Sequence, residues 1–264
     1  MNAVILIPAR YQSSRYPGKP LVEIKGSTGV ARPLIHRSVE AARRVAGVSG
    51  VFVLTDDERI AEACLPARVG VIMTSSECRN GTERCAEALS QLHEADLVIN
   101  FQGDALLTPK HFVEALIERM QRDDVDVATP AIRLRSSEVR ALQAEEAAGR
   151  VGGTSVVTDS EGRALYFSKR LIPHLPAGAL DGEMSPVRLH VGVYAYRPSA
   201  LTAYAQTPPS ELEQLEGLEQ LRFLDRGIPV AVVDVEPPPF ALRELNNPED
   251  VAPIEEALAS AGLE

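Results

Sequence analysis

The first part of the chain alternates short apolar runs with segments whose apolar residues recur at helical spacing. The apolar runs, which have the length of buried strands, occupy residues 4–7, 51–55, 69–74 and 95–104. The helical segments between them occupy residues 31–46, 56–65 and 83–89. This alternation predicts right-handed βαβ units and a mostly parallel sheet with helices on both faces. Ligands bind such sheets beyond the carboxyl ends of their strands.

The remainder of the chain continues the pattern with less regularity. Helices are predicted at residues 109–121, 135–153, 197–204, 210–227 and 248–261, and strands at 125–134, 189–196 and 228–236. A hairpin with a turn at 159–162 is predicted over 156–167. The 210–227 helix carries a leucine at every third position (Leu212, Leu215, Leu218, Leu221 and Leu224), which predicts a face packed into the core.

Two helix starts carry candidate capping residues. Asp56 or Asp57 is placed to cap the helix that follows the second strand, and Thr82 the helix that follows Asn80-Gly81. Arg84 lies in the first turn of that helix, where the helix dipole disfavours a cation. Arg84 therefore serves either a ligand or a structural salt bridge.

Composition narrows the class of protein. A chain of 264 residues with 45% hydrophobic content can bury a large core. The 37 acidic against 27 basic residues give a formal net charge of −10, which disfavours a general nucleic-acid-binding protein. No apolar run approaches membrane-spanning length and no signal peptide is visible. Three cysteines without paired metal spacing indicate reduced thiols, so we expect a cytoplasmic protein.

The loop after the first strand carries Arg10, Ser13, Arg15 and Lys19 among glycine and prolines. A buried strand that delivers such a loop is typical of a phosphate-binding edge, because arginine and lysine supply fixed charge to phosphate oxygens. A solvated basic loop is the alternative. Asp104 ends the fourth strand and is placed either to hold a divalent cation or to cap a turn. His190, in an apolar strand, is either a core residue or a ligand contact.

Several segments resemble the CMP-Kdo synthetases (3-deoxy-manno-octulosonate cytidylyltransferases). They are IPARYQSSRYPGKPL, NGTER, QGD, ALYFSKRLIP, HVGVYAYR and LEQLR, in the order found in that family. The resemblance implies a Rossmann-like three-layer nucleotidyltransferase fold with a smaller subdomain for acceptor binding and dimerisation. It implies one domain over 1–264, with nucleotide binding mainly in 1–130, acceptor binding and homodimer contacts in 131–235, and a C-terminal segment, 236–264, that returns to the metal site.

The resemblance also implies an activity and a set of site residues. CTP would be coupled to an anionic small-molecule acceptor with release of pyrophosphate and with Mg²⁺ as cofactor, most simply forming CMP-Kdo or a similar 3-deoxy-ulosonic acid derivative. The catalytic residues would be Arg10, Lys19 and Asp104, with nucleotide contacts from Pro8, Ala9, Arg10, Ser13, Lys19, Thr74, Ser75 and Gln102. The acceptor contacts would be Arg84, Gln102, Tyr166, Arg170, His190, Tyr194, Glu219 and Gln220. The metal ligands would be Asp104 and Asn246.

Besides Asn80, which replaces a serine in NGTER, four positions depart from the family pattern. Ala105 and Leu106 replace the residues that usually follow QGD, Ser155 replaces a lysine, and Asn246 replaces an aspartate that ligates magnesium. Asparagine offers a carbonyl oxygen without charge, so Asn246 either binds metal more weakly or only caps the helix before Pro248. These departures leave two alternatives open: a cytidylyltransferase for a small phosphonate such as phosphonoformate, and a nucleotide-binding protein with impaired catalysis.

Overall fold

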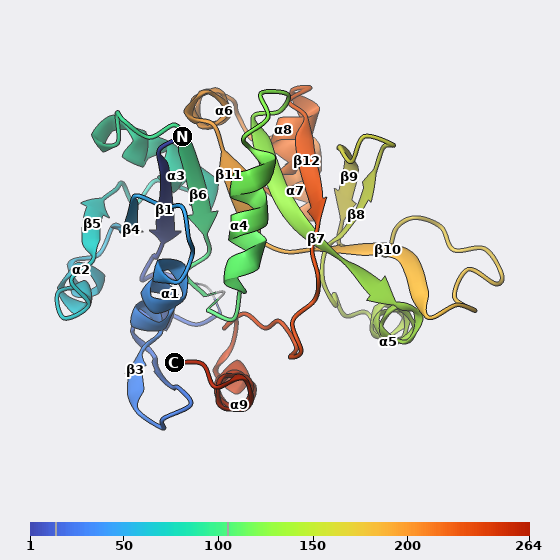
Figure 1. Ribbon diagram of the computed structural model, residues 1–264, viewed down its shortest axis with the longest axis horizontal. Coiled ribbons are helices and arrows are strands. Elements are labelled where there is room, and N and C mark those ends of the chain that lie inside the picture. The colour runs from blue at the N-terminus through green and yellow to red at the C-terminus, as the bar shows by residue number, and fades with distance from the viewer. Residues whose placement is uncertain (14, 105) are drawn as a thin grey trace.

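A ten-stranded sheet forms the centre of the protein in a computed structural model that describes residues 1–13, 15–104 and 106–264 (Figure 1). The strand order is β5-β4-β1-β6-β11-β7-β10-β8-β9, and β12 pairs with β7. The strands are β1 (Ala3–Pro8), β4 (Gly50–Thr55), β5 (Gly70–Met73), β6 (Leu97–Phe101), β7 (Val127–Arg135), β8 (Ser155–Thr158), β9 (Ala164–Ser168), β10 (Met184–His190), β11 (Val193–Tyr196) and β12 (Val230–Asp234).

The sheet is parallel where the sequence predicts βαβ units. Strand β1 pairs in parallel with β4 and β6, β4 with β5, and β12 with β7. Strand β11 runs antiparallel to β6 and β7, and the outer strands β10, β8 and β9 continue in antiparallel pairs. The predicted 189–196 strand is thus two strands, β10 and β11, which share β7 as a neighbour while β10 also pairs with β8 and β11 with β6.

Helices cover both faces of the sheet, which confirms the predicted three layers. One face packs against α1 (Leu34–Arg43), α2 (Glu58–Cys64) and α4 (Lys110–Arg119), and Figure 1 shows α1 and α4 in front of the sheet. The other face packs against α3 (Gly81–Ala88), α6 (Pro198–Ala205) and α8 (Leu221–Asp225). Successive residues of β1 alternate between the two cores, as a strand buried on both faces requires.

A third core lies beneath the ends of β1 and β6. A two-stranded sheet of β2 (Glu23–Lys25) and β3 (Ala31–Pro33) packs against α9 (Val251–Ala261), and Leu245 is fully buried among them. The N–H of Leu245 donates to the carbonyl oxygen of Asp104 at 3.2 Å. The C-terminal part of the chain is therefore attached directly to the residue that follows β6.

Two predicted helix starts differ from the structure. The 31–46 helix begins only at Leu34, because residues 31–33 pair with β2. Thr82 does not cap α3; the Asn80 side chain does so by accepting from the N–H of Glu83 at 2.8 Å. Asp57 caps α2 through the N–H of Arg59, as one of the two predicted alternatives.

The 210–227 segment is not one helix with a buried leucine stripe. It forms α7 (Glu211–Glu216) and α8, because Gly217 adopts a left-handed conformation with φ of 60° that ends α7. The change of direction leaves Leu212 and Leu215 exposed by 43% and 76% and buries Leu218 and Leu221. Residues 136–147 form α5 (Ser136–Ala147), as predicted.

Arg222, the arginine of the LEQLR segment, stabilises the sheet face that is covered by α3, α6 and α8. Arg222 is 1% exposed and donates to both carboxylate oxygens of Glu213, at 2.5 and 2.6 Å. It also pairs with Glu83 at 3.2 Å and lies over the ring of Tyr204, 3.8 Å from its centroid. One buried cation therefore connects α3, α6, α7 and α8.

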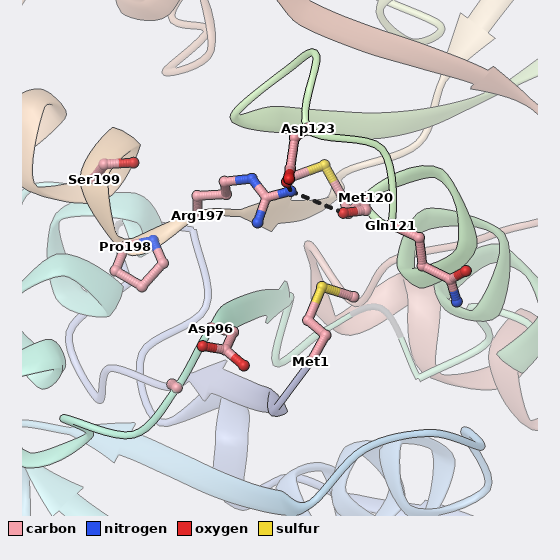
Figure 2. Close-up of a pocket in the computed structure, with 9 residues that line it drawn as sticks. Met1, Asp96, Met120, Gln121, Asp123, Arg197, Pro198 and Ser199 are labelled. Atoms are coloured by element: carbon pink, nitrogen blue, oxygen red, sulfur yellow. Dashed lines mark hydrogen bonds and ion pairs between the residues drawn. The ribbon is translucent and has the colours of Figure 1, made fainter.

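A hollow of about 510 Å³ lies beside the N-terminal ends of β1 and β6 (Figure 2). Arg197 donates there to the carbonyl oxygen of Met120 at 3.0 Å and pairs with Asp123 at 2.5 Å. Arg197 and Asp123 pair with each other and the Asp96 carboxylate accepts from the backbone N–H of Asn2 at 2.7 Å, so we assign this hollow a structural role. No helix within the described ranges is long and apolar enough to cross a membrane.

Replacing Arg222 by methionine should lower the free energy of unfolding by about 3–5 kcal/mol, because Glu213 would be left as a buried, unpaired carboxylate. Urea unfolding followed by circular dichroism measures the change. Arg226→Met is the matched control, since this side chain is 50% exposed and its pair with Asp225 spans 4.0 Å. The control should change stability by less than about 0.5 kcal/mol. Equal effects of the two substitutions would contradict the assignment.

Candidate active site

A cavity of about 880 Å³ opens at the carboxyl ends of β1 and β6. This is the place that a parallel sheet offers to a ligand, and the volume suits a nucleotide together with a second small molecule. Thirteen of the predicted site residues line the cavity: Pro8, Ala9, Arg10, Ser13, Lys19, Arg84, Gln102, Asp104, His190, Tyr194, Glu219, Gln220 and Asn246. The fold thus brings together residues from six separate segments of the chain.

The wall formed by the loop after β1 is cationic. Arg10, Arg15 and Lys19 all line the cavity, and the Lys19 ammonium pairs with the Asp104 carboxylate. Gly18 has φ of 74°, which an L side chain rarely adopts, so glycine allows the turn that delivers Lys19. This cationic wall is the arrangement that the phosphate-binding alternative predicts.

Gly103 fixes the distance between this wall and Asp104. A Cβ atom at position 103 would lie 2.6 Å from the carbonyl oxygen of Pro8, far inside van der Waals contact. Only glycine therefore allows the backbone after β6 to lie against the end of β1. Residue 105 lies outside the described residues, while Leu106 is buried in the third core with Leu245.

The first turn of α3 forms a second wall. The N–H of Thr82 donates to the Glu219 carboxylate at 3.2 Å, which places this acid at the helix N-terminus. Burial raises the pKa of Glu219, and the hydrogen bonds from Thr82 oppose this effect. Glu219 is thus a carboxylate held beside the cavity by the backbone of α3.

Arg84 lines the cavity and also takes part in a salt bridge. Its side chain is 3% exposed, lies 3.5 Å from the Asp56 carboxylate and donates to the Thr74 hydroxyl. The two sequence alternatives for Arg84 are therefore compatible, because Asp56 and Thr74 fix a guanidinium whose edge borders the cavity. Thr74 itself lies behind Arg84 and does not line the cavity.

His190 and Tyr194 form the wall on the side of β10 and β11. The Thr129 hydroxyl lies 2.9 Å from Nε2 of His190 and donates its proton to the carbonyl oxygen of Val193 at 2.8 Å. Nε2 must then be the protonated nitrogen, which leaves Nδ1 as an acceptor. Burial lowers the pKa of His190 to about 3, so this histidine is neutral at physiological pH.

Two buried amide side chains lack partners within the described part of the protein. They are Gln220, whose Nε2 is unpaired, and Asn100, whose amide nitrogen and oxygen are both unpaired. Buried polar groups are nearly always hydrogen-bonded, so unpaired amides near a cavity indicate a bound polar ligand or water. Gln220 lines the cavity directly, and Asn100 is fully buried at the end of β6.

The structure keeps four predicted site residues out of the cavity walls. Besides Thr74, they are Ser75, which is exposed, Tyr166, which donates to Glu216 at 3.3 Å, and Arg170, which pairs with Glu146 at 3.1 Å. Their ligand contacts remain predictions. Ser155, the substitute for the family's lysine, accepts from the N–H of Ile172 at 3.1 Å and supports the backbone after β9.

Sequence reasoning named Arg15 in the first loop without its partner Asn246, and it did not single out Glu244, which also lines the cavity. The Arg15 guanidinium donates to Oδ1 of Asn246 at 2.7 Å, so this amide does not cap the following helix. Burial and the charge of Asp104 raise the pKa of Glu244, while Asn246, Lys19 and Arg15 oppose the rise. The available signal was proximity along the chain, since Glu244 lies two residues before Asn246.

Oxygen donors suited to Mg²⁺ are present on one side of the cavity. Asp104 and Glu244 supply carboxylates and Asn246 an amide oxygen, and hard cations prefer such ligands. Within the described residues no group of three or more His, Cys, Asp and Glu side chains is arranged to hold a metal ion. A cation here would therefore be completed by phosphate oxygens and water, as is usual for Mg²⁺ at a nucleotide.

The lowered pKa of His190 has a measurable consequence. An unfolded chain takes up a proton at histidine near pH 6.5, whereas the folded protein keeps His190 neutral down to about pH 3. The stability due to neutral His190 is complete above that unfolded pKa and is lost progressively as the pH falls below it. We expect His190→Gln to weaken this acid destabilisation, measured by urea unfolding at several pH values. Imidazole NMR signals of His190 that titrate between about pH 5 and 8 would contradict the assignment.

Comparison with known proteins identifies the family. A family model described as cytidylyltransferase matches residues 4–230. The 3-deoxy-manno-octulosonate cytidylyltransferase of Maricaulis maris is 39% identical over 99% of both chains, and the 8-amino-3,8-dideoxy-manno-octulosonate cytidylyltransferase of Shewanella piezotolerans is 38% identical over 98% of this chain and 99% of its own. A solved structure of CMP:2-keto-3-deoxy-manno-octonic acid synthetase complexed with CTP is 36% identical and covers 99% of this chain and 100% of its own. Its TM-score of 0.84 confirms the fold. This chain therefore belongs to the CMP-Kdo synthetase (3-deoxy-manno-octulosonate cytidylyltransferase) family of the cytidylyltransferases.

Proposed function

We propose that this protein transfers the cytidylyl group of CTP to 3-deoxy-manno-octulosonate, or to a closely similar 3-deoxy-ulosonic acid, and releases pyrophosphate. The acceptor's anomeric hydroxyl oxygen forms a bond to the α-phosphorus of CTP and loses its proton. The bond from that phosphorus to the bridging oxygen breaks, and pyrophosphate leaves with the electron pair. The observation that carries the proposal is that one cavity is lined both by a cationic wall and by a wall of hydrogen-bonding side chains.

The cationic wall suits the triphosphate of CTP. Arg10 and Lys19 bring fixed positive charge to the cavity, and Ser13 adds a hydroxyl. In-line displacement at phosphorus needs chiefly positioning and charge neutralisation, which these residues can supply without a covalent enzyme intermediate. This is the part of the site in which the sequence matches the family most fully.

The opposite wall suits an anionic sugar acid. Arg84 offers a cation for a carboxylate, while neutral His190, Gln220 and Gln102 offer hydrogen bonds to hydroxyl groups. The unpaired amide of Gln220 supports this assignment, because a buried donor without a protein partner can be satisfied by the acceptor. Glu219, held by the backbone of α3, can accept from a sugar hydroxyl.

We further propose Mg²⁺ as cofactor, held by Asp104 and the triphosphate. When bound, the ion would neutralise charge that develops on the pyrophosphate leaving group. Lys19, which pairs with Asp104, would then be available for a phosphate oxygen. Asp104 thus connects the nucleotide wall with the metal.

A cytoplasmic homodimer is part of the proposal, with a place in lipopolysaccharide biosynthesis. Exposed Leu165 and Leu215 belong to the part of the chain assigned to dimerisation, and burying them in a subunit contact would be favourable. Sedimentation velocity measures the oligomeric state, and a monomer at micromolar concentration would contradict the dimer.

The test of the function is pyrophosphate release by purified protein supplied with CTP, Mg²⁺ and one acceptor at a time. We expect turnover with 3-deoxy-manno-octulosonate or its 8-amino analogue. Turnover with phosphonoformate alone would replace the proposed acceptor by a small phosphonate. Binding of CTP without release for every acceptor would contradict the proposed activity and favour a protein with impaired catalysis.

Replacing Asp104 by alanine should abolish Mg²⁺-dependent turnover. Losing a metal ligand at the triphosphate removes several kcal/mol of charge stabilisation, equivalent to a rate decrease of about 10³-fold. Calorimetry should show that CTP binding weakens but persists, because Arg10 and Lys19 remain. Asp225→Ala is the control, since this carboxylate is 42% exposed and does not line the cavity. Undiminished activity of the Asp104 variant would exclude it as a metal ligand.

A further inference from the structure

The segment of residues 242–246 lines the cavity and is anchored at Leu245. Leu245 is fully buried in the third core, and its N–H donates to the carbonyl oxygen of Asp104 at 3.2 Å. Glu244 and Asn246 flank this anchored residue on either side along the chain, and both line the cavity. The anchor at Leu245 therefore holds both side chains beside Asp104.

Asn246, which occupies the position of the family's aspartate, is already engaged. Its Oδ1, the one side-chain atom that could ligate a hard cation, accepts from the Arg15 guanidinium at 2.7 Å. A cation placed at the same oxygen would also face the positive charge of Arg15 at close range. Asn246 thus fixes Arg15 in the cationic wall and brings no negative charge.

Glu244 supplies the missing charge from two residues upstream. Its Oε2 lies 3.5 Å from Nδ2 of Asn246, so the amide steers the carboxylate. Its Oε1 lies near Gly192, where an added Cβ would be 3.6 Å away, and the absence of a side chain at 192 leaves room for it. The side chain is open to the cavity, with the charges of Asp104, Lys19 and Arg15 as neighbours.

We propose that Glu244, and not Asn246, provides the second carboxylate for the divalent cation at the triphosphate. The inference rests on the proposed function, because it concerns the Mg²⁺ of that reaction. Asp104 and Glu244 together provide two negative charges, the number that Asp104 and an aspartate at position 246 would have given. The substitution at 246 is thus compensated within the same segment, and Arg15 gains a fixed partner.

The test measures metal binding without turnover. Wild-type protein and variants are loaded with a non-hydrolysable CTP analogue, and Mn²⁺ is titrated as a spectroscopic substitute for Mg²⁺ while free Mn²⁺ is followed by electron paramagnetic resonance. Glu244→Gln should weaken Mn²⁺ binding about 10-fold or more, because affinity follows the number of charged ligands. Asn246→Ala should change it by no more than about 3-fold, since a neutral amide already engaged by Arg15 contributes little.

Two further variants separate charge from structure. Glu249→Gln, an exposed carboxylate in the same part of the chain, should bind Mn²⁺ as wild type does. Adding Asn246→Asp to Glu244→Gln should restore affinity, because it returns the second carboxylate to the family position. The melting temperature of each variant shows that the loss of affinity does not come from unfolding.

The outcomes distinguish this inference from the function on which it rests. If wild-type protein with the CTP analogue binds no Mn²⁺, the proposed metal dependence fails and the inference fails with it. If wild-type protein binds Mn²⁺ and Glu244→Gln binds it equally well, only the inference is overturned. A Glu244 variant with unchanged Mn²⁺ affinity but weaker binding of the sugar acid would assign the carboxylate to the acceptor instead.

Discussion

The contact between Gly103 and the end of β1 determines how the whole site is assembled. The absence of a side chain at 103 lets the backbone after β6 reach the carbonyl oxygen of Pro8. Asp104 is thereby brought to the ammonium of Lys19, and its carbonyl oxygen receives the N–H of Leu245. Three segments far apart in the sequence meet at this one residue. Any larger residue at 103 would separate the cationic wall from the carboxylate that balances it.

Several cations of the cavity are held by specific partners, although the whole chain carries a formal net charge of −10. Lys19 faces Asp104, Arg84 faces Asp56, and Arg15 is held by the neutral amide of Asn246. A triphosphate could replace the carboxylates as the partner of these cations, and a divalent cation could in turn occupy the carboxylates. The pairs thus hold the side chains close to the positions in which a metal–nucleotide complex would need them, which limits the cost of reorganisation on binding.

Interactions away from the cavity determine its acceptor wall. Arg222 belongs to a segment that resembles the family's acceptor-binding motif, yet its guanidinium is buried against Glu213, Glu83 and Tyr204. By connecting four helices it holds the neighbouring Glu219 and Gln220 against the first turn of α3. The arginine of this motif is therefore explained by packing, and the two preceding polar residues by the cavity.

The sequence by itself determined the parallel half of the sheet, because short buried strands and amphipathic helices have different periods. It also determined the cationic loop and Asp104, since these residues follow strands whose carboxyl ends must meet. Local geometry, which periodicity does not record, decided two further features. Gly217 divides a regular leucine pattern into two helices, and Asn80 caps α3 in place of Thr82. Only the tertiary structure related Glu244 to Asp104 and Asn246 to Arg15, because such contacts join residues that lie far apart along the chain. Their positions depend on how Leu245 packs in a core that no single segment encodes.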